Sequence, residues 1–220
     1  MEHELRKFAD AETLAQSAAA FVAVRARQAV ATKGNFTFAV SGGRTPWAMF
    51  AKLVSCNMPW AHTVIYQVDE RVAPEGDPSR NLTNLMTAIA NARTPPLIMS
   101  MPVNAGDLDT GAKEYGAKLP ARFDMVHLGL GPDGHTASLV PGDPVLDVTD
   151  RMIAITEPYQ GHQRFTMTYP ALARADQILW LVTGDDKRQP LKLLLEGDTS
   201  IPAGRVEAAR SLIMADEAAL

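Results

Sequence analysis

The chain has 220 residues, of which 46% are hydrophobic and 21% are charged, and its formal net charge is −4 with a pI near 5.7. This length is sufficient for a substantial buried core, and the acidic balance gives no electrostatic footprint for nucleic acid or an anionic membrane. A single cysteine, Cys56, excludes an intramolecular disulfide framework and a multi-cysteine metal site. The charged N-terminus and the lack of any run of about 18 apolar residues predict a soluble, cytoplasmic protein without a signal peptide or membrane span.

The hydrophobic pattern alternates between amphipathic helices and short apolar strands. Helical spacing over about residues 10–32 predicts a first helix that Gly34 ends, and residues 36–40 form an apolar strand. Thr45 and Pro46 are typical of an N-cap and a first helical position, so a second helix is expected there. Further strands are predicted over residues 63–68, 97–101, 125–130, 152–156, 165–169, 178–182 and 211–214. Further helices are predicted around residues 82–89, 106–119 and 191–195.

This alternation is typical of an α/β fold with a mainly parallel sheet and helices on both faces. Because no repeat, low-complexity tract or flexible linker interrupts the pattern, we expect residues 1–220 to form a single domain. Ligands of such sheets bind at the carboxyl ends of the strands. Four polar or glycine-rich clusters follow predicted strands, and we expect them to form one site. They are residues 41–43, 69–71, 129–135 and 183–187.

The most informative segment is VHLGLGPDGHTASLVPG, residues 126–142. An apolar strand leads into a loop with three glycines, and His135 follows where a short helix is expected to begin. Such a turn lets backbone N–H groups converge on an anion, and a histidine can transfer a proton near neutral pH. The segment therefore indicates an enzyme that acts on a small phosphorylated metabolite. A simpler interpretation stays open, in which the glycines only turn the chain and His135 is a surface residue.

The loop from Ser41 to Pro46 is a second candidate for an anion site. Its glycines allow a phosphate to approach the backbone, and Ser41 and Thr45 can donate hydroxyl hydrogen bonds at a helix N-terminus. The loop matches neither the Walker pattern nor a full dinucleotide fingerprint. An ordinary strand-to-helix turn with Thr45 as the cap is the alternative.

Several charged residues have both a functional and a plain structural interpretation. The run Asp69-Glu70-Arg71 can orient a sugar hydroxyl and hold an anion, or it can be a solvated cluster at a strand end. Lys187 lies near a predicted helix start and can bind phosphate as a point charge, yet alone it and Arg164 are equally ordinary surface residues. Arg80 and Asn81 either start a helix or line the same cleft.

His135 is the histidine best suited to catalysis. With an ordinary pKa of about 6.5, a histidine can act as a general base on water, although it can also donate to a loop carbonyl. The other histidines lack a comparable glycine setting. Among them, His127 lies within a strand pattern, and we expect it to be packed and hydrogen-bonded.

Taken together, these segments resemble the 6-phosphogluconolactonases, which are related to glucosamine-6-phosphate deaminases and ribose-5-phosphate isomerases. The resemblance covers nearly the whole chain through residues 41–46, 69–71, 129–139 and 184–187. The deaminases usually carry Asp-Glu-Tyr where this chain has Asp69-Glu70-Arg71, and they differ after the Gly-His pair, which favours the lactonases. The chain departs from the lactonase pattern at Val140, where phenylalanine is common, and at Arg80, which interrupts a Ser-Asn pair.

The resemblance implies a Rossmann-like α/β fold and hydrolysis of 6-phospho-D-glucono-1,5-lactone to 6-phosphogluconate, the second step of the oxidative pentose phosphate pathway. In this interpretation His135 activates water, Arg71 and backbone N–H groups stabilise the oxyanion, and Asp69 or Glu70 orients His135 or binds ring hydroxyls. The residues expected to bind the substrate or its phosphate are Ser41, Gly42, Gly43, Arg44, Thr45, Glu70, Gly131, Asp133, Gly134, Arg164 and Lys187.

The expected partner is a small phosphorylated sugar lactone, with no nucleic acid, membrane, cofactor or metal involved. The sequence leaves the oligomeric state open, and a monomer is compatible with it. Two other functions stay open: a sugar-phosphate isomerase of the deaminase type, and a non-catalytic sugar-phosphate sensor.

Overall fold

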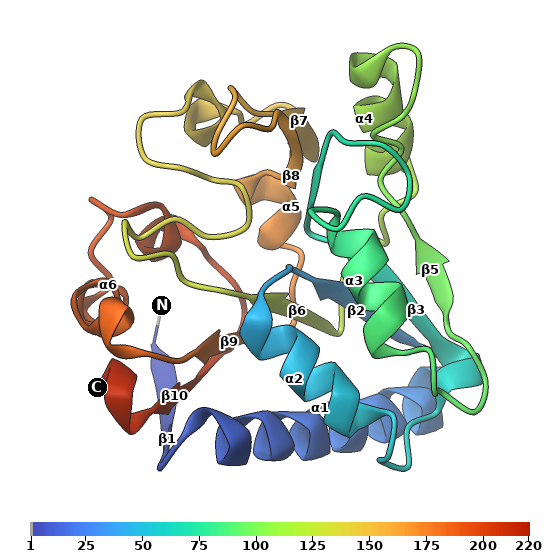
Figure 1. Ribbon diagram of the computed structural model, residues 1–220, viewed down its shortest axis with the longest axis vertical. Helices are drawn as coiled ribbons and strands as arrows, with labels where there is room; N and C mark the ends of the chain where they lie inside the picture. Colours follow the sequence, from blue (N-terminus) through green and yellow to red (C-terminus); the bar gives the residue numbers. More distant parts are fainter. Residues whose placement is uncertain (1) are drawn as a thin grey trace.

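The computed structural model describes residues 2–220, and its strands form two sheets (Figure 1). The strands are β1 His3–Phe8, β2 Phe36–Val40, β3 Thr63–Gln67, β4 Asp69–Arg71, β5 Leu97–Met99, β6 Met125–Leu128, β7 Ile153–Ile155, β8 Arg164–Met167, β9 Ile178–Val182 and β10 Ser211–Asp216. The α-helices are α1 Ala11–Lys33, α2 Arg44–Leu53, α3 Asn81–Ala88, α4 Leu108–Ala117, α5 Tyr169–Leu172 and α6 Arg188–Glu196. Short 3-10 turns include Asp185–Lys187, just before α6. Within the described residues, no helix is long and apolar enough to cross a membrane.

Seven strands form a parallel sheet in the order β1-β10-β9-β6-β2-β3-β5, which confirms the predicted fold class. The chain leaves β2 toward β3 on one side, whereas β6 continues toward β9 on the other side. In open α/β sheets, ligands bind in the crevice outside the strand ends where the strand order reverses in this way. The loops that follow β2 and β6 therefore lie at the expected position for a site.

The second sheet is antiparallel, in the order β4-β8-β7, and the sequence does not predict it. Strands at β7 and β8 are expected from their apolar pattern, but β4 consists of three charged residues that follow β3 almost directly. A polar segment of this length has no hydrophobic periodicity that would distinguish a strand from a loop. The pairing of β4 with β8 is a tertiary feature, and it places the charged run of β4 beside the start of β8.

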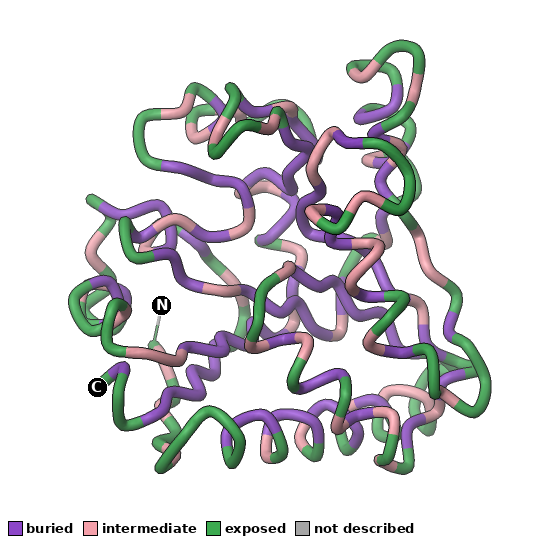
Figure 2. The backbone as a smooth tube through the Cα atoms, in the orientation of Figure 1, coloured by how far each residue is buried: buried purple, intermediate pink, exposed green. Residues whose placement is uncertain are grey.

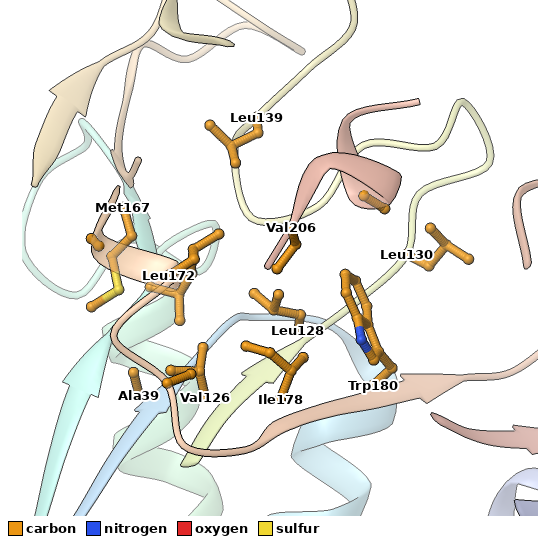
Figure 3. Close-up of a cluster of buried hydrophobic side chains, with 14 of the residues drawn as sticks. Ala39, Val126, Leu128, Leu130, Leu139, Met167, Leu172, Ile178, Trp180 and Val206 are labelled. Atoms are coloured by element: carbon orange, nitrogen blue, oxygen red, sulfur yellow. The ribbon is translucent and has the colours of Figure 1, made fainter. Parts of the chain in front are cut away.

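Two hydrophobic clusters cover the two faces of the parallel sheet. Because successive strand residues point to opposite faces, Leu179 and Leu181 of β9 pack toward α1, α2 and α3. Ile178 and Trp180 belong instead to the cluster on the side of α4, α5, α6 and the second sheet. Figure 3 shows them together with Leu172 of α5 and Met167 of β8. All five residues of β9 are buried, as Figure 2 shows for most of the strand backbone. Full burial stabilises each such side chain by about 1.5–3 kcal/mol.

The N-terminal elements agree with the sequence except for β1. Asp10 caps α1 by accepting a hydrogen bond of 2.7 Å from the Thr13 N–H, and Gly34 ends the helix with a left-handed φ of 86°. The residues before Asp10 form β1, which pairs with β10 at the edge of the sheet. Their many charges obscure a strand pattern, and such charges are common on edge strands because they oppose further pairing.

Two local predictions are wrong. The N-cap of α2 is Gly43, whose φ of 136° is open to glycine, and Thr45 lies in the first turn. No helix begins at His135, because the loop turns back on itself. The Gly131 N–H donates to the His135 carbonyl at 2.8 Å, and the Thr136 hydroxyl donates to the Gly129 carbonyl at 2.8 Å.

His127 on β6 is fully buried at the centre of the parallel sheet. It is packed as expected, but neither ring nitrogen has a hydrogen-bond partner of good geometry among the described residues. Burial lowers the pKa of His127 from 6.5 to about 3, and the Ser41 backbone opposes this only in part. The folded chain therefore keeps this imidazole neutral at pH values where the unfolded chain protonates it.

We predict that His127→Leu removes part of the acid sensitivity of the protein. Between pH 6.5 and about 3 only the unfolded state binds the extra proton. The free energy of unfolding therefore decreases by about 1.4 kcal/mol for each unit by which the pH is lowered, from this group alone. Urea unfolding at pH 7 and at pH 5 measures this slope, with His62→Leu at an exposed histidine as the control. Equal pH dependence in the wild type and His127→Leu would contradict the prediction.

Candidate active site

A cleft of about 290 Å³ lies at the carboxyl edge of the parallel sheet, near the lower limit of volume for small-molecule sites. All four clusters that the sequence places at this edge contribute to it. Its lining residues are Ser41, Gly42, Gly43, Arg44, Thr45, Pro46, Asp69, Arg71, Asn81, Gly129, Leu130, Gly131, Pro132, His135, Ala137, Arg164, Leu181, Val182, Thr183 and Lys187. Of the residues expected in the site, Glu70, Asp133 and Gly134 are outside this lining.

The alternation of β4 explains why Glu70 is not in the cleft. Asp69 and Arg71 point to one face of the strand, and Glu70 points to the other, where it is fully buried. Its carboxylate accepts hydrogen bonds from the backbone N–H groups of Asn81, at 2.7 Å, and Leu82, at 2.9 Å, at the start of α3. It also forms an ion pair of 3.0 Å with the buried Arg80. Glu70 and Arg80 thus connect β4 to α3, because a carboxylate is stabilised at a helix N-terminus.

Asn81, whose role the sequence leaves open, connects three parts of the cleft. Its side-chain oxygen accepts from the Arg71 guanidinium at 2.9 Å, and its amide nitrogen donates to the Asp69 carbonyl at 3.0 Å. A Cβ on Gly42 would lie only 1.9 Å from the Asn81 Oδ1 atom, so the close packing requires glycine there. The first residue of α3 therefore holds both the β4 side chains and the loop after β2.

Two arginines face each other across the second sheet, since Arg71 and Arg164 are directly opposed in the β4–β8 register. Like charges in this position repel each other. Arg164 is 3% exposed, and its Nε has no hydrogen-bond partner among the described residues. Burial and the charge of Arg71 lower the pKa of Arg164, and Asp69 offsets this in part. An anion bound between the guanidinium groups would relieve the repulsion and satisfy the free donor.

Asp69 is the buried carboxylate beside these arginines. Burial raises its pKa, and a 2.8 Å hydrogen bond from the Ser138 hydroxyl, together with Arg71 and Arg164, acts in the opposite direction. Its carboxylate accepts hydrogen bonds from Ser138 and Asn81, whereas Arg71 and Arg164 act on it through their charge. Asp69 therefore adds a negative charge near the arginines, while another carboxylate, Asp133, contacts His135.

The start of α2 and the loop after β9 form a second cluster of polar groups in the cleft, of a kind that suits a phosphate. The helix has no side-chain cap, and the Thr45 hydroxyl lies 2.9 Å from that of Thr183, which joins the two loops. The Ser41 hydroxyl is buried without a hydrogen-bond partner in the described part of the chain. Lys187, paired with Asp186 at 2.6 Å, and the exposed Arg44 add positive charge. A helix N-terminus with such neighbours favours a bound anion.

His135 is held by its own loop. Its Nδ1 lies 2.5 Å from the Asp133 Oδ1, which also accepts the His135 backbone N–H at 3.1 Å. Partial burial raises the pKa of Asp133, but these hydrogen bonds and the imidazole charge outweigh burial and leave the pKa below its usual value. A Cβ on Gly131 would lie 2.0 Å from the imidazole. With Nδ1–H donated to Asp133, Nε2 is the nitrogen that can accept a proton.

Asp133 and Gly134 act on the cleft through this loop. Gly134 has a left-handed φ of 80°, and a Cβ there would lie 2.6 Å from Ile201, so the turn requires glycine. Tyr159, which no sequence pattern indicates, packs edge-on against His135 with ring centroids 5.7 Å apart. Ala137 lines the cleft with a left-handed φ of 52°, a conformation that L residues rarely adopt and that concentrates at functional sites.

The cleft is cationic although the chain is acidic. Its lining contains four cationic side chains, Arg44, Arg71, Arg164 and Lys187, against one carboxylate, Asp69. Residues 2–220 contain no group of three or more His, Cys, Asp or Glu side chains placed to hold a metal ion. Fold and cleft together define an α/β protein with a small, positively charged cleft that contains a histidine.

The chain belongs to the family described as glucosamine-6-phosphate isomerases/6-phosphogluconolactonase, whose model matches residues 9–214. It is 37% identical to a Pseudomonas putida 6-phosphogluconolactonase over 209 residues, which cover 89% of this chain and 84% of that protein. It is also 38% identical over 192 residues to the rabbit (Oryctolagus cuniculus) GDH/6PGL endoplasmic bifunctional protein. There the match covers 80% of this chain but only 24% of the much longer relative.

Solved structures show the same fold. The Thermotoga maritima 6-phosphogluconolactonase superposes with a TM-score of 0.89 at 22% identity, covering 98% of this chain and all of that chain. A monomeric glucosamine-6-phosphate deaminase superposes with a TM-score of 0.87 at 18% identity, covering 98% of each chain. The fold alone therefore does not separate the two activities.

We predict that Glu70→Gln destabilises the protein through the start of α3. Removing one partner of a buried ion pair typically costs about 3–5 kcal/mol, because the other charge stays buried. Urea unfolding measures the change in free energy, with Glu75→Gln at an exposed carboxylate of the following loop as the matched control. A loss no larger than that of the control would show that the Glu70–Arg80 pair does not support this part of the fold.

Proposed function

We propose that the chain hydrolyses 6-phospho-D-glucono-1,5-lactone to 6-phosphogluconate, in the second step of the oxidative pentose phosphate pathway. Relatives of similar length carry the name 6-phosphogluconolactonase, including one from Caulobacter vibrioides that is 35% identical over 208 residues. The observation that carries the proposal is a cationic cleft in which a carboxylate holds the only lining histidine among the described residues.

The phosphate of the substrate binds at the start of α2 in this proposal. Backbone N–H groups at Gly43–Thr45 and the Lys187 ammonium surround it, and the free Ser41 hydroxyl is available to donate. Arg44 adds charge from the exposed rim. From the sequence, Arg164 is either a ligand of the substrate or its phosphate, or an ordinary surface residue. Because it lies with Arg71 and Asp69 on the second sheet, we assign it to the lactone end of the substrate.

The reaction then proceeds by general-base catalysis. His135 Nε2 accepts a proton from water as the water oxygen attacks the lactone carbonyl carbon, and Asp133 stabilises the imidazolium through Nδ1. Arg71 and Arg164 stabilise the oxyanion of the tetrahedral intermediate. The intermediate collapses by breaking the bond from the carbonyl carbon to the ring oxygen, which takes the proton from His135. The resulting carboxylic acid ionises.

The main alternative is a deaminase of the same family, and the arginine pair argues against it. Arg71 stands where the deaminases usually have tyrosine, and it faces the buried Arg164. Two guanidinium groups favour a substrate that develops negative charge and disfavour one that carries an ammonium group. A non-catalytic sensor would bind the sugar phosphate without turnover.

We predict that His135→Ala lowers kcat/KM for lactone hydrolysis by about 10²–10⁴-fold, the usual cost of losing a general base. The rate is measured above the spontaneous hydrolysis of the lactone, and circular dichroism checks that the variant is folded. His62→Ala, at an exposed histidine, is the control and should keep the wild-type rate. A folded His135→Ala protein with unchanged turnover would refute the assigned base.

We predict that Lys187→Met acts mainly on KM. Loss of a hydrogen bond to a charged group, worth about 1.5–3 kcal/mol, raises KM by roughly 10- to 150-fold, with a smaller effect on kcat. The preference for the phosphorylated lactone over unphosphorylated gluconolactone should fall by the same factor. Lys192→Met, on the exposed side of α6, is the control. An unchanged preference in Lys187→Met would mean that Lys187 does not bind the phosphate.

A further inference from the structure

Tyr159 lies at the tip of the hairpin that joins β7 to β8. Tyr159 and His162 exchange backbone hydrogen bonds of 2.9 and 3.2 Å, and the two residues between them, Gln160 and Gly161, have φ values of 51° and 81°. Positive φ at both central residues is what a type I′ turn requires, and this turn matches the twist of two paired strands. The hairpin thus holds Tyr159 in a defined position.

The first contact of Tyr159 is with the base and its carboxylate. Its ring meets the His135 imidazole at an interplanar angle of 67°. Its hydroxyl donates a long hydrogen bond of 3.4 Å to Asp133 Oδ2, while Oδ1 binds His135. Burial and the Asp133 charge raise the pKa of Tyr159, so the hydroxyl stays protonated and can donate.

The second contact is with Arg164. The guanidinium carbon lies 5.1 Å from the centre of the Tyr159 ring, in cation–π geometry. The Arg164 Nη2 also donates to the Tyr159 carbonyl at 3.3 Å and to the Gln160 side chain at 3.4 Å. Because Arg164 is almost fully buried and opposed by Arg71, these contacts replace a stable ion pair in fixing its position.

We propose that Tyr159 is a positioning residue, whose ring and carbonyl hold the Arg164 guanidinium at the cleft while its hydroxyl steadies the Asp133–His135 pair. The inference rests on the proposed lactonase function and adds to it a residue that acts through others. The ring is the larger contribution, since the hydroxyl bond is long and the Arg164 guanidinium is shielded from water.

Two substitutions separate the ring from simple packing. Tyr159→Phe keeps the aromatic face and should stay within about threefold of the wild-type kcat/KM, the effect of one weak hydrogen bond. Tyr159→Leu fills the space without an aromatic face, and its kcat/KM should be about 30-fold lower than that of the wild type, as expected for the loss of a desolvated cation–π contact. Gln163→Ala, at an exposed position of the same hairpin, should match the wild type.

A second measurement tests that Tyr159 acts through Arg164. In an Arg164→Met background, Tyr159→Leu should lower kcat/KM by less than threefold, because the guanidinium that the ring contacts is already absent. Equal activity of the Phe and Leu variants, or the same 30-fold loss in both backgrounds, would overturn the proposal.

The affinity of the same variants for 6-phosphogluconate, measured by calorimetry, should follow the same order as their activity. A wild-type chain that binds 6-phosphogluconate without hydrolysing the lactone would contradict the proposed function, and the binding order would still decide the role of Tyr159.

Discussion

The cationic side of the cleft depends on the interactions of the buried Glu70 carboxylate with α3 and Arg80. This carboxylate binds the first backbone N–H groups of α3 and pairs with the buried Arg80, so it joins the second sheet to the helix. That junction places Asn81 against Gly42 and beside Arg71. The face of β4 opposite to Glu70 then presents Asp69 and Arg71 to the cleft. A residue expected to bind substrate is thus the residue that positions those that do face the site.

Much of the fold and the location of the site follow from the sequence. Apolar strands such as residues 36–40 and 178–182 are recognised by their pattern, and polar clusters at their ends meet because parallel strands share one carboxyl edge. Successive side chains of a strand point to opposite faces, which separates Glu70 from Asp69 and Arg71. This separation follows from the sequence only if the charged run is known to be a strand. Whether residues 1–220 form one domain, and which roles the site residues have, stay predictions.

Other features depend on contacts between distant segments. Tyr159 reaches His135 through a hairpin whose turn requires positive φ at Gln160, a residue type seldom found in such turns. The opposition of Arg71 and Arg164 arises from a β4–β8 register that no local pattern indicates. The loop at His135 looks like a helix start in sequence, yet its glycines let it fold back onto its own carbonyls.

We propose that a positively charged cleft, in which a carboxylate holds the histidine, hydrolyses a phosphorylated lactone. The most direct measurement is acid release from freshly prepared 6-phosphogluconolactone by the purified chain, corrected for spontaneous hydrolysis. Ammonia release from glucosamine 6-phosphate is followed in parallel. We expect rapid lactone hydrolysis above background and no ammonia release. Ammonia release without accelerated lactone hydrolysis would contradict the claim.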